Sequence, residues 1–224
     1  MAETLISSEL FTSEEVSRIL LHNQVFSIEN SAVYPWSGGL MSPIYSDLRL
    51  LNSDVDGRTK ITDHFISLIQ THKTPDIIAG VVTAGLPWAT RISDRMRLPM
   101  IPIRPQPKDH GTGKQIEGRV MPGQNAIVVE DTLSTAGSSL SAVEALRNEG
   151  AKVNRILAIL NYKLFNSSEN AKKVRVALDA LTDFPTVMRV AEKENYWTKQ
   201  QIEIAKEWYK DPQQWGMRVG LKNP

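Results

Sequence analysis

Four short apolar segments, separated by stretches with helical periodicity, constrain the fold of this chain more than any other feature. They cover residues 77–82, 100–104, 125–130 and 153–160. Helices are expected over about 55–71, over the segment that carries Arg91, Arg95 and Arg97, and over 138–148 with Gly150 as the stop. Apolar runs of this length are typical of strands buried on both faces. The alternation predicts an α/β fold with a mainly parallel central sheet flanked by helices, and ligands at the carboxyl ends of its strands.

The segments before and after this pattern are more mixed. Thr12 followed by Glu15 forms a capping box, which predicts a short amphipathic first helix. Residues 42–50 alternate between two faces, which is the pattern of a strand. One face carries Ile44, Ser46, Leu48 and Leu50, and the other carries Tyr45, Asp47 and Arg49. After Asn161 we expect a charged helix near 167–173, a strand over 174–181 and helical stretches through Tyr209.

The composition fits one folded domain and excludes several kinds of site. At ~150 residues per domain, 224 residues make a single domain. The 26 Lys and Arg residues nearly balance the 25 Asp and Glu residues, so the net charge of +1 provides no general field for nucleic acid. The absence of cysteine excludes disulfides and thiolate metal sites. The apolar stretch at 77–89 is shorter than the ~20 residues that span a bilayer, and the N-terminus lacks a secretory pattern. We therefore expect a cytoplasmic protein without a nucleic-acid or membrane partner.

The strongest local signal lies at 126–140, AIVVEDTLSTAGSSL, where an apolar strand leads through a small polar loop into a helix. Backbone N–H groups at such a helix start form a site for a terminal phosphate, helped by the hydroxyls of Ser134, Thr135, Ser138 and Ser139. The segment lacks Gly-Lys-Ser/Thr and G-x-G-x-x-G, so it is neither a Walker loop nor a dinucleotide fingerprint. A Ser/Thr/Gly loop alone is more often a solvated turn with a capping serine.

Two adjacent carboxylates, Glu130 and Asp131, distinguish this loop from a solvated turn. Acids beside a phosphate cradle repel the anion unless they bind something else, such as ribose hydroxyls or Mg²⁺. A phosphate site next to a diol site indicates a ribose phosphate as the ligand.

This segment resembles the phosphoribosyl diphosphate (PRPP) motif of type I phosphoribosyltransferases. Three further segments are similar to orotate phosphoribosyltransferases: SGGLMSPIYSDLR at 37–49, GVVTAGLPWAT at 80–90 and RPQPKDHGTGKQIEG at 104–118. Residues 183–215 resemble the C-terminal part of the shorter, single-function bacterial forms of that enzyme. The similarity covers most of the chain.

The resemblance implies a fold and a reaction. The fold is the type I phosphoribosyltransferase fold over 1–224, with a small hood formed by N-terminal and C-terminal segments. Its expected parts are a helix and hood elements over about 1–50, a PRPP-binding core over about 55–165, and a C-terminal strand and helices over about 166–224. The reaction is Mg²⁺-dependent transfer of the 5-phosphoribosyl group from PRPP to orotate, which gives orotidine 5′-monophosphate and pyrophosphate in de novo pyrimidine (UMP) biosynthesis. Mg²⁺ is expected to be held through PRPP, with Asp131 as the one protein ligand to consider.

The resemblance also implies roles for individual residues. The PRPP-binding positions are Thr83, Ala84, Gly85, Arg104, Lys108, His110, Glu130, Asp131, Ser134, Thr135, Ala136, Gly137, Ser138 and Ser139. The catalytic positions are Lys108, His110 and Asp131. The orotate-binding positions are Ser42, Ile44, Tyr45, Ser134 and Tyr162. In this family the loop corresponding to 104–118 acts in the neighbouring subunit's site, which implies a homodimer.

The chain departs from the family pattern at several basic positions. Trp36, Ala84 and Pro105 stand where many members carry lysine. The arginine that often meets the orotate carboxylate is also missing, which leaves Tyr162 or Lys163 in that neighbourhood. Two alternatives stay open: a type I phosphoribosyltransferase that acts on a purine base, and a non-catalytic regulatory protein that keeps the PRPP fold.

Overall fold

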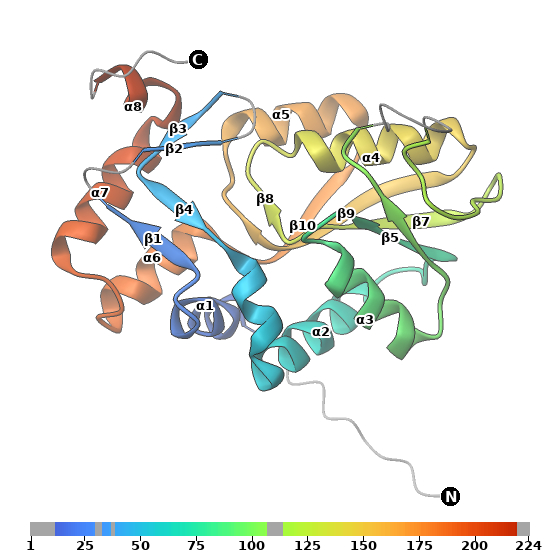
Figure 1. Ribbon diagram of the computed structural model, residues 1–224, viewed down its shortest axis with the longest axis horizontal. Coiled ribbons are helices and arrows are strands. Elements are labelled where there is room, and N and C mark those ends of the chain that lie inside the picture. The colour runs from blue at the N-terminus through green and yellow to red at the C-terminus, as the bar shows by residue number, and fades with distance from the viewer. Residues whose placement is uncertain (1–11, 30–32, 37–38, 107–113, 219–224) are drawn as a thin grey trace, which may run out of the picture.

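A parallel sheet forms the centre of the molecule (Figure 1). The computed structural model describes residues 12–29, 33–36, 39–106 and 114–218. The main strands are β5 (Ile77–Val81), β6 (Met100–Ile103), β7 (Asn125–Val129), β9 (Lys152–Asn161) and β10 (Ala177–Asp183). They lie in the order β10-β9-β7-β5-β6, and the short strand β8 (Thr132–Leu133) pairs with the end of β9. Each of these pairings is parallel, so the predicted mainly parallel sheet is confirmed.

Helices cover both faces of this sheet (Figure 1). The helices are α2 (Val55–Gln70) and α3 (Leu86–Met96) on one face, and α4 (Gly137–Asn148) and α5 (Phe165–Val174) on the other. Alternate residues of β7 point to the two layers because successive side chains of a strand face opposite sides. Ile127 and Val129 pack with α2 and α3, while Ala126 and Val128 pack with α4 and α5.

The strand order places a crevice between β5 and β7. β5 leads through α3 to β6 on one side, and the chain then crosses to β7 on the other side of β5. From β7 it continues outward to β9 and β10. In open α/β sheets, ligands bind outside the carboxyl ends of the strands at the point where the order reverses. The turns that follow β5 and β7 are therefore the expected site of function.

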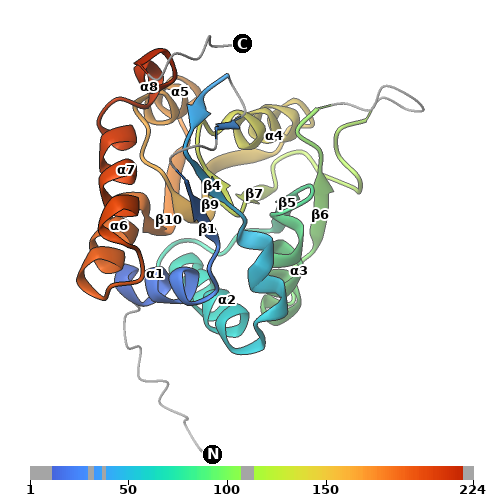
Figure 2. The same cartoon turned by 60° about the vertical axis from the view of Figure 1, so that its left-hand side comes forward.

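The N-terminal and C-terminal segments lie together at one end of the sheet (Figure 2). They comprise α1 (Ser13–His22), α6 (Phe184–Lys193), α7 (Lys199–Lys210) and α8 (Pro212–Arg218), with the antiparallel pairs β1 (Phe26–Ile28) with β4 (Ile44–Ser46) and β2 (Tyr34–Pro35) with β3 (Met41–Ser42). The indole N–H of Trp208 in α7 donates to the Met41 carbonyl oxygen of β3 at 3.1 Å. Trp208 also packs edge-on against Trp36 and Tyr162. These contacts hold the small strands over the carboxyl end of β9.

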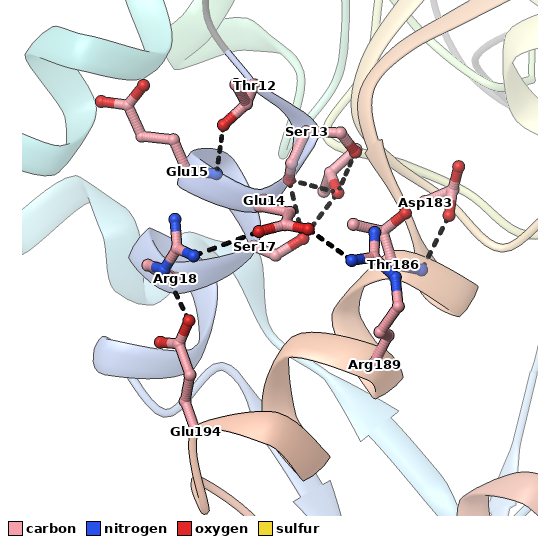
Figure 3. Close-up of polar contacts among 11 residues, drawn as sticks. Thr12, Ser13, Glu14, Glu15, Ser17, Arg18, Asp183, Thr186, Arg189 and Glu194 are labelled. Carbon is pink, nitrogen blue, oxygen red and sulfur yellow. Dashed lines mark hydrogen bonds and ion pairs between the residues drawn. The ribbon is translucent and has the colours of Figure 1, made fainter.

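The first helix is fixed to the C-terminal part by a polar network (Figure 3). Thr12 caps α1 by accepting from the Glu15 N–H at 3.2 Å, which is one of the two hydrogen bonds of the predicted capping box. The hydroxyl of Ser17 lies 2.7 Å from that of Thr182 at the end of β10. Two ion pairs, Arg18 with Glu194 and Glu14 with Arg189, join α1 to the helix α6 region. Helix α1 is thereby joined to the end of β10 and to helix α6.

The strand expected over 42–50 is shorter than predicted. β4 ends at Ser46, and residues Leu48–Ser53 form a 3₁₀ helix, because the Asp47 side chain accepts from the Arg49 N–H at 3.1 Å and caps a helical turn. The change of period buries Leu51 and leaves Leu50 exposed, so the prediction of a strand face with Leu48 and Leu50 was wrong. The strand expected from 174 also begins later, because Arg175 adopts a left-handed conformation that ends α5.

The two ends of the loop at 104–118 are joined by backbone hydrogen bonds. Arg104 N–H donates to the Gln115 carbonyl oxygen, and Glu117 N–H donates to that of Pro102, both at 2.9 Å. Residues 107–113, which include Lys108 and His110, lie outside the described residues.

Candidate active site

The turn after β5 forms one wall of a cavity of about 250 Å³ at the carboxyl ends of the strands. Thr83 and Ala84 line it, and the peptide bond between Val82 and Thr83 is cis. Gly85 lies against the backbone of β7: a Cβ atom there would be 2.3 Å from the Val129 carbonyl oxygen. Because real Cβ atoms do not approach an oxygen so closely, only glycine fits this junction without a backbone shift. The junction fixes the turn beside the residues that follow β7.

The two acids that follow β7 form the floor of the same cavity. Glu130 is 8% exposed, and its Oε1 accepts from the Asp131 N–H at 3.1 Å. Burial raises the pKa of Glu130 well above its usual range, and the neighbouring Asp131 carboxylate raises it further. Burial also raises the pKa of Asp131. Adjacent buried carboxyls with raised pKa values are typical of sites kept for a ligand, because they destabilise the free protein.

The helix α4 begins directly after the polar loop, and its first turn is left open. Its N-cap residue is Ala136, which has a left-handed φ of 61° and provides no side-chain acceptor. The first N–H groups of a helix then remain available, and with the helix dipole they favour an anion. The structure places this helix start at the cavity, beside the acid pair, as the sequence predicts for a phosphate cradle.

Most of the predicted PRPP-binding positions therefore meet at one cavity. Those that line it are Thr83, Ala84, Glu130, Asp131, Ser134, Thr135, Ala136, Gly137, Ser138 and Ser139. Sequence reasoning missed Val81, Val82, Pro105 and Thr132, which also line it. Thr132 could have been found, because it continues the run of polar residues after Glu130 and Asp131. A second cavity of about 710 Å³ shares Thr135 with the first and extends toward α5, α7 and α8.

The donor set of the cavity fits Mg²⁺ held largely by a substrate. Within the described ranges, no group of three or more His, Cys, Asp and Glu side chains could form a metal cage. Mg²⁺ prefers oxygen ligands, keeps several waters, and is often bound through one or two carboxylates plus substrate phosphates. Asp131 provides such a carboxylate, and the buried Thr132 hydroxyl beside it has no hydrogen-bond partner in the described part of the chain.

The predicted basic residues are less closely tied to the cavity. The guanidinium of Arg104 forms an ion pair with Glu117 at 2.8 Å, across the base of the loop. Its neighbour Pro105 lines the cavity. Lys163, at the end of β9, pairs with Asp183 at 2.5 Å and lines the second cavity instead.

The predicted orotate-binding residues differ in exposure. Ser42, Ile44 and Tyr162 are buried, and the Tyr162 ring stacks on Phe184 with centroids 4.7 Å apart. Tyr45 is 38% exposed, and its ring faces that of Tyr34 at 5.4 Å. Tyr45 and Ser134, which lines the first cavity, are therefore the members of this group whose side chains a ligand can reach.

Comparison with known proteins decides the family. The protein-family model that describes the phosphoribosyl transferase domain matches residues 56–182 of this chain. An orotate phosphoribosyltransferase of Cytophaga hutchinsonii is 39% identical over 204 residues, covering 91% of this chain and 98% of that protein. This chain belongs to the orotate phosphoribosyltransferase family. A second family member, from Coxiella burnetii, is 39% identical over 202 residues, covering 90% of this chain and 97% of its own length. The resemblance inferred from the motifs is thereby confirmed.

A solved orotate phosphoribosyltransferase has the same fold. The crystal structure of the family member from Aeropyrum pernix superposes with a TM-score of 0.68 at 24% identity, and the match covers 81% of this chain and 99% of that one. The expected type I phosphoribosyltransferase fold is therefore confirmed. Within the described residues, no helix is long and apolar enough to cross a membrane.

Replacing the buried acid with its amide should stabilise the free protein. The raised pKa of Glu130 means that the folded state binds its proton more tightly than the unfolded state, so stability falls as pH rises above about 4.5. Glu130→Gln removes this ionisation, and we expect its Tm at pH 8 to exceed that of the native protein by about 2 °C or more, with a flatter dependence on pH. Glu144→Gln, on the exposed face of α4, is the matched control. Thermal unfolding from pH 5 to 9 checks this prediction. It would be contradicted if the Tm of Glu130→Gln depended on pH in the same way as the Tm of the native protein.

Proposed function

We propose that this protein transfers the 5-phosphoribosyl group of PRPP to orotate, giving orotidine 5′-monophosphate and pyrophosphate in de novo pyrimidine (UMP) biosynthesis. The observation that carries the proposal is the meeting of an open helix N-terminus with the adjacent carboxyl groups of Glu130 and Asp131 in one cavity. A phosphate cradle beside a diol-binding pair is the recognition that a phosphorylated ribose needs.

The cavity supports one placement of PRPP. The 5-phosphate lies at the start of α4, where it accepts from backbone N–H groups and from the hydroxyls of Ser138 and Ser139. The ribose hydroxyls donate to Glu130 and Asp131, which satisfies the two buried acids. The pyrophosphate then lies along the turn formed by residues 83–85. Each part of the substrate meets a group of matching hydrogen-bonding character.

The reaction is a displacement at C1 of the ribose. The bond from C1 to the pyrophosphate oxygen breaks, with its electron pair leaving on pyrophosphate. A bond from C1 to a ring nitrogen of orotate forms, and that nitrogen loses its proton. Positive charge develops on the ribose, and Asp131 stabilises it because the carboxylate is fixed in a poorly solvated cavity. Rate enhancement comes from this electrostatic stabilisation and from positioning. Asp131 would hold Mg²⁺ together with the bound PRPP, and the ion would supply charge neutralisation for the leaving pyrophosphate.

The loop at 104–118 completes the proposed site. We assign Lys108 and His110 to the leaving pyrophosphate, where a cation or proton donor lowers the cost of the developing charge. Arg104 contributes at the base of the loop once it is released from Glu117. As in the family pattern, each loop acts in the site of the neighbouring subunit of a homodimer. The homodimer and the cytoplasmic location are proposals drawn from the sequence.

A panel of bases tests the proposed substrate. PRPP and Mg²⁺ are mixed with the purified protein and with orotate, uracil, hypoxanthine or adenine in parallel, and loss of each base is followed by absorbance. We expect turnover of orotate and at least about 100-fold lower kcat/KM for the other bases. Turnover of a purine instead would leave the PRPP-binding residues as assigned, but it would show that orotate is not the substrate. Binding of PRPP without turnover of any base would favour the regulatory alternative.

A further inference from the structure

The loop at 104–118 has a neck, formed by residues 102–105 and 115–117, whose two halves are joined through their backbones. The two hydrogen bonds described above link the halves, and an antiparallel bridge pairs Ile103 with Ile116 between them. Because backbone contacts already close the neck, a polar side chain within it can serve another purpose.

The neck lies beside the part of the cavity that we assign to pyrophosphate. β5 and β6 pair in parallel, and the Val82 N–H donates to the Ile103 carbonyl oxygen at 2.9 Å. The turns that follow these two strands are therefore adjacent, and both line the cavity, one through Thr83 and the other through Pro105. Since the proposed pyrophosphate lies along the turn after β5, the position of Pro105 decides the shape of the wall that it meets.

The side chain of Gln115 joins the neck to helix α4. Its Nε2 donates to the Arg104 carbonyl oxygen at 2.7 Å and to the Ser141 hydroxyl at 3.0 Å. The Pro105 carbonyl oxygen is a third, longer contact at 3.3 Å. A glutamine amide has two N–H donors, so the two shorter contacts use both of them. One side chain thereby links the outgoing half of the neck to the second turn of α4.

The same helix holds the opposite end of the proposed substrate. Residues 137–139 at the start of α4 line the cavity where we place the 5-phosphate, and Ser141 follows on the same helix. Fixing the neck to Ser141 therefore fixes the distance between the phosphate cradle and the wall at Pro105. A site whose parts are held in place before the substrate binds loses less entropy on binding and orients the reacting groups.

We propose that Gln115 is a positioning residue for the pyrophosphate end of PRPP. It holds Arg104 and Pro105 in place relative to α4, and it is not itself a lining residue of the cavity. The inference rests on the proposed function and deepens it, by naming the residue that sets the wall facing the leaving group. Binding of the 5-phosphate and of orotate does not depend on it.

The test compares two ligands that share the ribose and the 5-phosphate but differ in the pyrophosphate. PRPP and ribose 5-phosphate, each with Mg²⁺, are titrated into the native protein, Gln115→Leu, Ser141→Ala and the double variant. The kcat for transfer to orotate is measured in parallel. Gln115→Leu removes the donor and keeps a side chain of similar size. Ser141→Ala removes the acceptor on α4 without lowering helix propensity, so it stays informative if Gln115→Leu folds poorly.

Gln124→Leu is the matched control for these variants. Gln124 is also a half-buried glutamine whose side chain bonds to the backbone, because its Oε1 accepts from the Met121 N–H at 2.8 Å. It is not a lining residue of the cavity. We expect native affinities and a native kcat in this control.

We expect Gln115→Leu to weaken PRPP binding about 5- to 10-fold and to lower kcat about 10-fold. The Kd for ribose 5-phosphate should change by less than about twofold, because this ligand lacks the group that the neck faces. Ser141→Ala should produce the same pattern with a smaller effect, since the contact of Gln115 with the Arg104 carbonyl oxygen remains. The double variant should match Gln115→Leu, because both substitutions remove the same link.

The two ligands separate positioning of the pyrophosphate from a general structural defect. Equal weakening of PRPP and ribose 5-phosphate in Gln115→Leu would indicate a disturbance of α4 and would overturn the inference. Unchanged PRPP affinity and kcat in Gln115→Leu, or fully additive effects in the double variant, would also overturn it. These outcomes leave the proposed function intact, whereas a native protein that binds neither ligand would show that both the proposed function and the inference are wrong.

Discussion

Asp131→Asn should weaken binding of PRPP about 5- to 150-fold, which corresponds to about 1 to 3 kcal/mol. In the proposed complex a ribose hydroxyl donates to the Asp131 carboxylate, and an amide nitrogen in its place cannot accept that hydrogen. Burial raises the pKa of the Asp131 carboxyl group, and the substitution removes this ionisable group. The free variant should therefore be at least as stable as the native protein. A loss of affinity without a loss of stability separates this role from a structural one.

Isothermal titration of PRPP with Mg²⁺ measures the effect of Asp131→Asn. Asp94→Asn, an exposed acid near the end of α3, is the control and should bind PRPP as the native protein does. Full PRPP affinity in Asp131→Asn would refute the assignment of Asp131 to the ribose.

Gly85→Ala should lower kcat/KM about 100-fold, because it displaces the turn after β5 from the acids after β7. The added Cβ would lie 2.3 Å from the Val129 carbonyl oxygen and 3.0 Å from both Glu130 Cα and the Val81 carbonyl oxygen. All three are backbone atoms, in β5, in β7 and directly after β7, so the crowding cannot be relieved by a side-chain rotation. Overpacking of this kind costs about 1 to 3 kcal/mol of stability.

Gly137→Ala provides the contrast for the stability measurement. A Cβ at Gly137 has no neighbour nearer than the Thr135 hydroxyl at 3.9 Å, so this variant should unfold at the same denaturant concentration as the native protein. Denaturant unfolding and steady-state kinetics of both variants check the prediction. Native stability and native kcat/KM in Gly85→Ala would show that the junction of β5 and β7 is not constrained as the structure indicates.

That the residues assigned to PRPP line one cavity could be predicted from the sequence, because most of them belong to two turns. Glu130 and Asp131 are adjacent, and the loop and helix start follow within eight residues of Glu130. Their approach to residues 83–85 follows from the parallel strand order, which the alternation of strands and helices already favoured.

The surroundings of the predicted orotate-binding residues were harder to predict because their contacts join distant segments. The local period-two pattern at 42–50 indicated a strand, but the Asp47 side chain caps a 3₁₀ turn that rotates Arg49 toward Tyr45. Tyr162 is buried because Trp208, far along the chain, packs against its ring. Neither contact has a signal in a single sequence, since each depends on which surfaces the hood elements cover.

Transfer of the phosphoribosyl group to orotate is tested by following orotate and pyrophosphate in the same reaction. The purified protein is mixed with PRPP, Mg²⁺ and orotate, and the loss of orotate absorbance is compared with the release of pyrophosphate. We expect one pyrophosphate to be released for each orotate consumed, with no orotate loss when PRPP is omitted. The proposed transfer would be contradicted by pyrophosphate release without orotate consumption. It would also be contradicted if PRPP bound but neither pyrophosphate was released nor orotate was consumed.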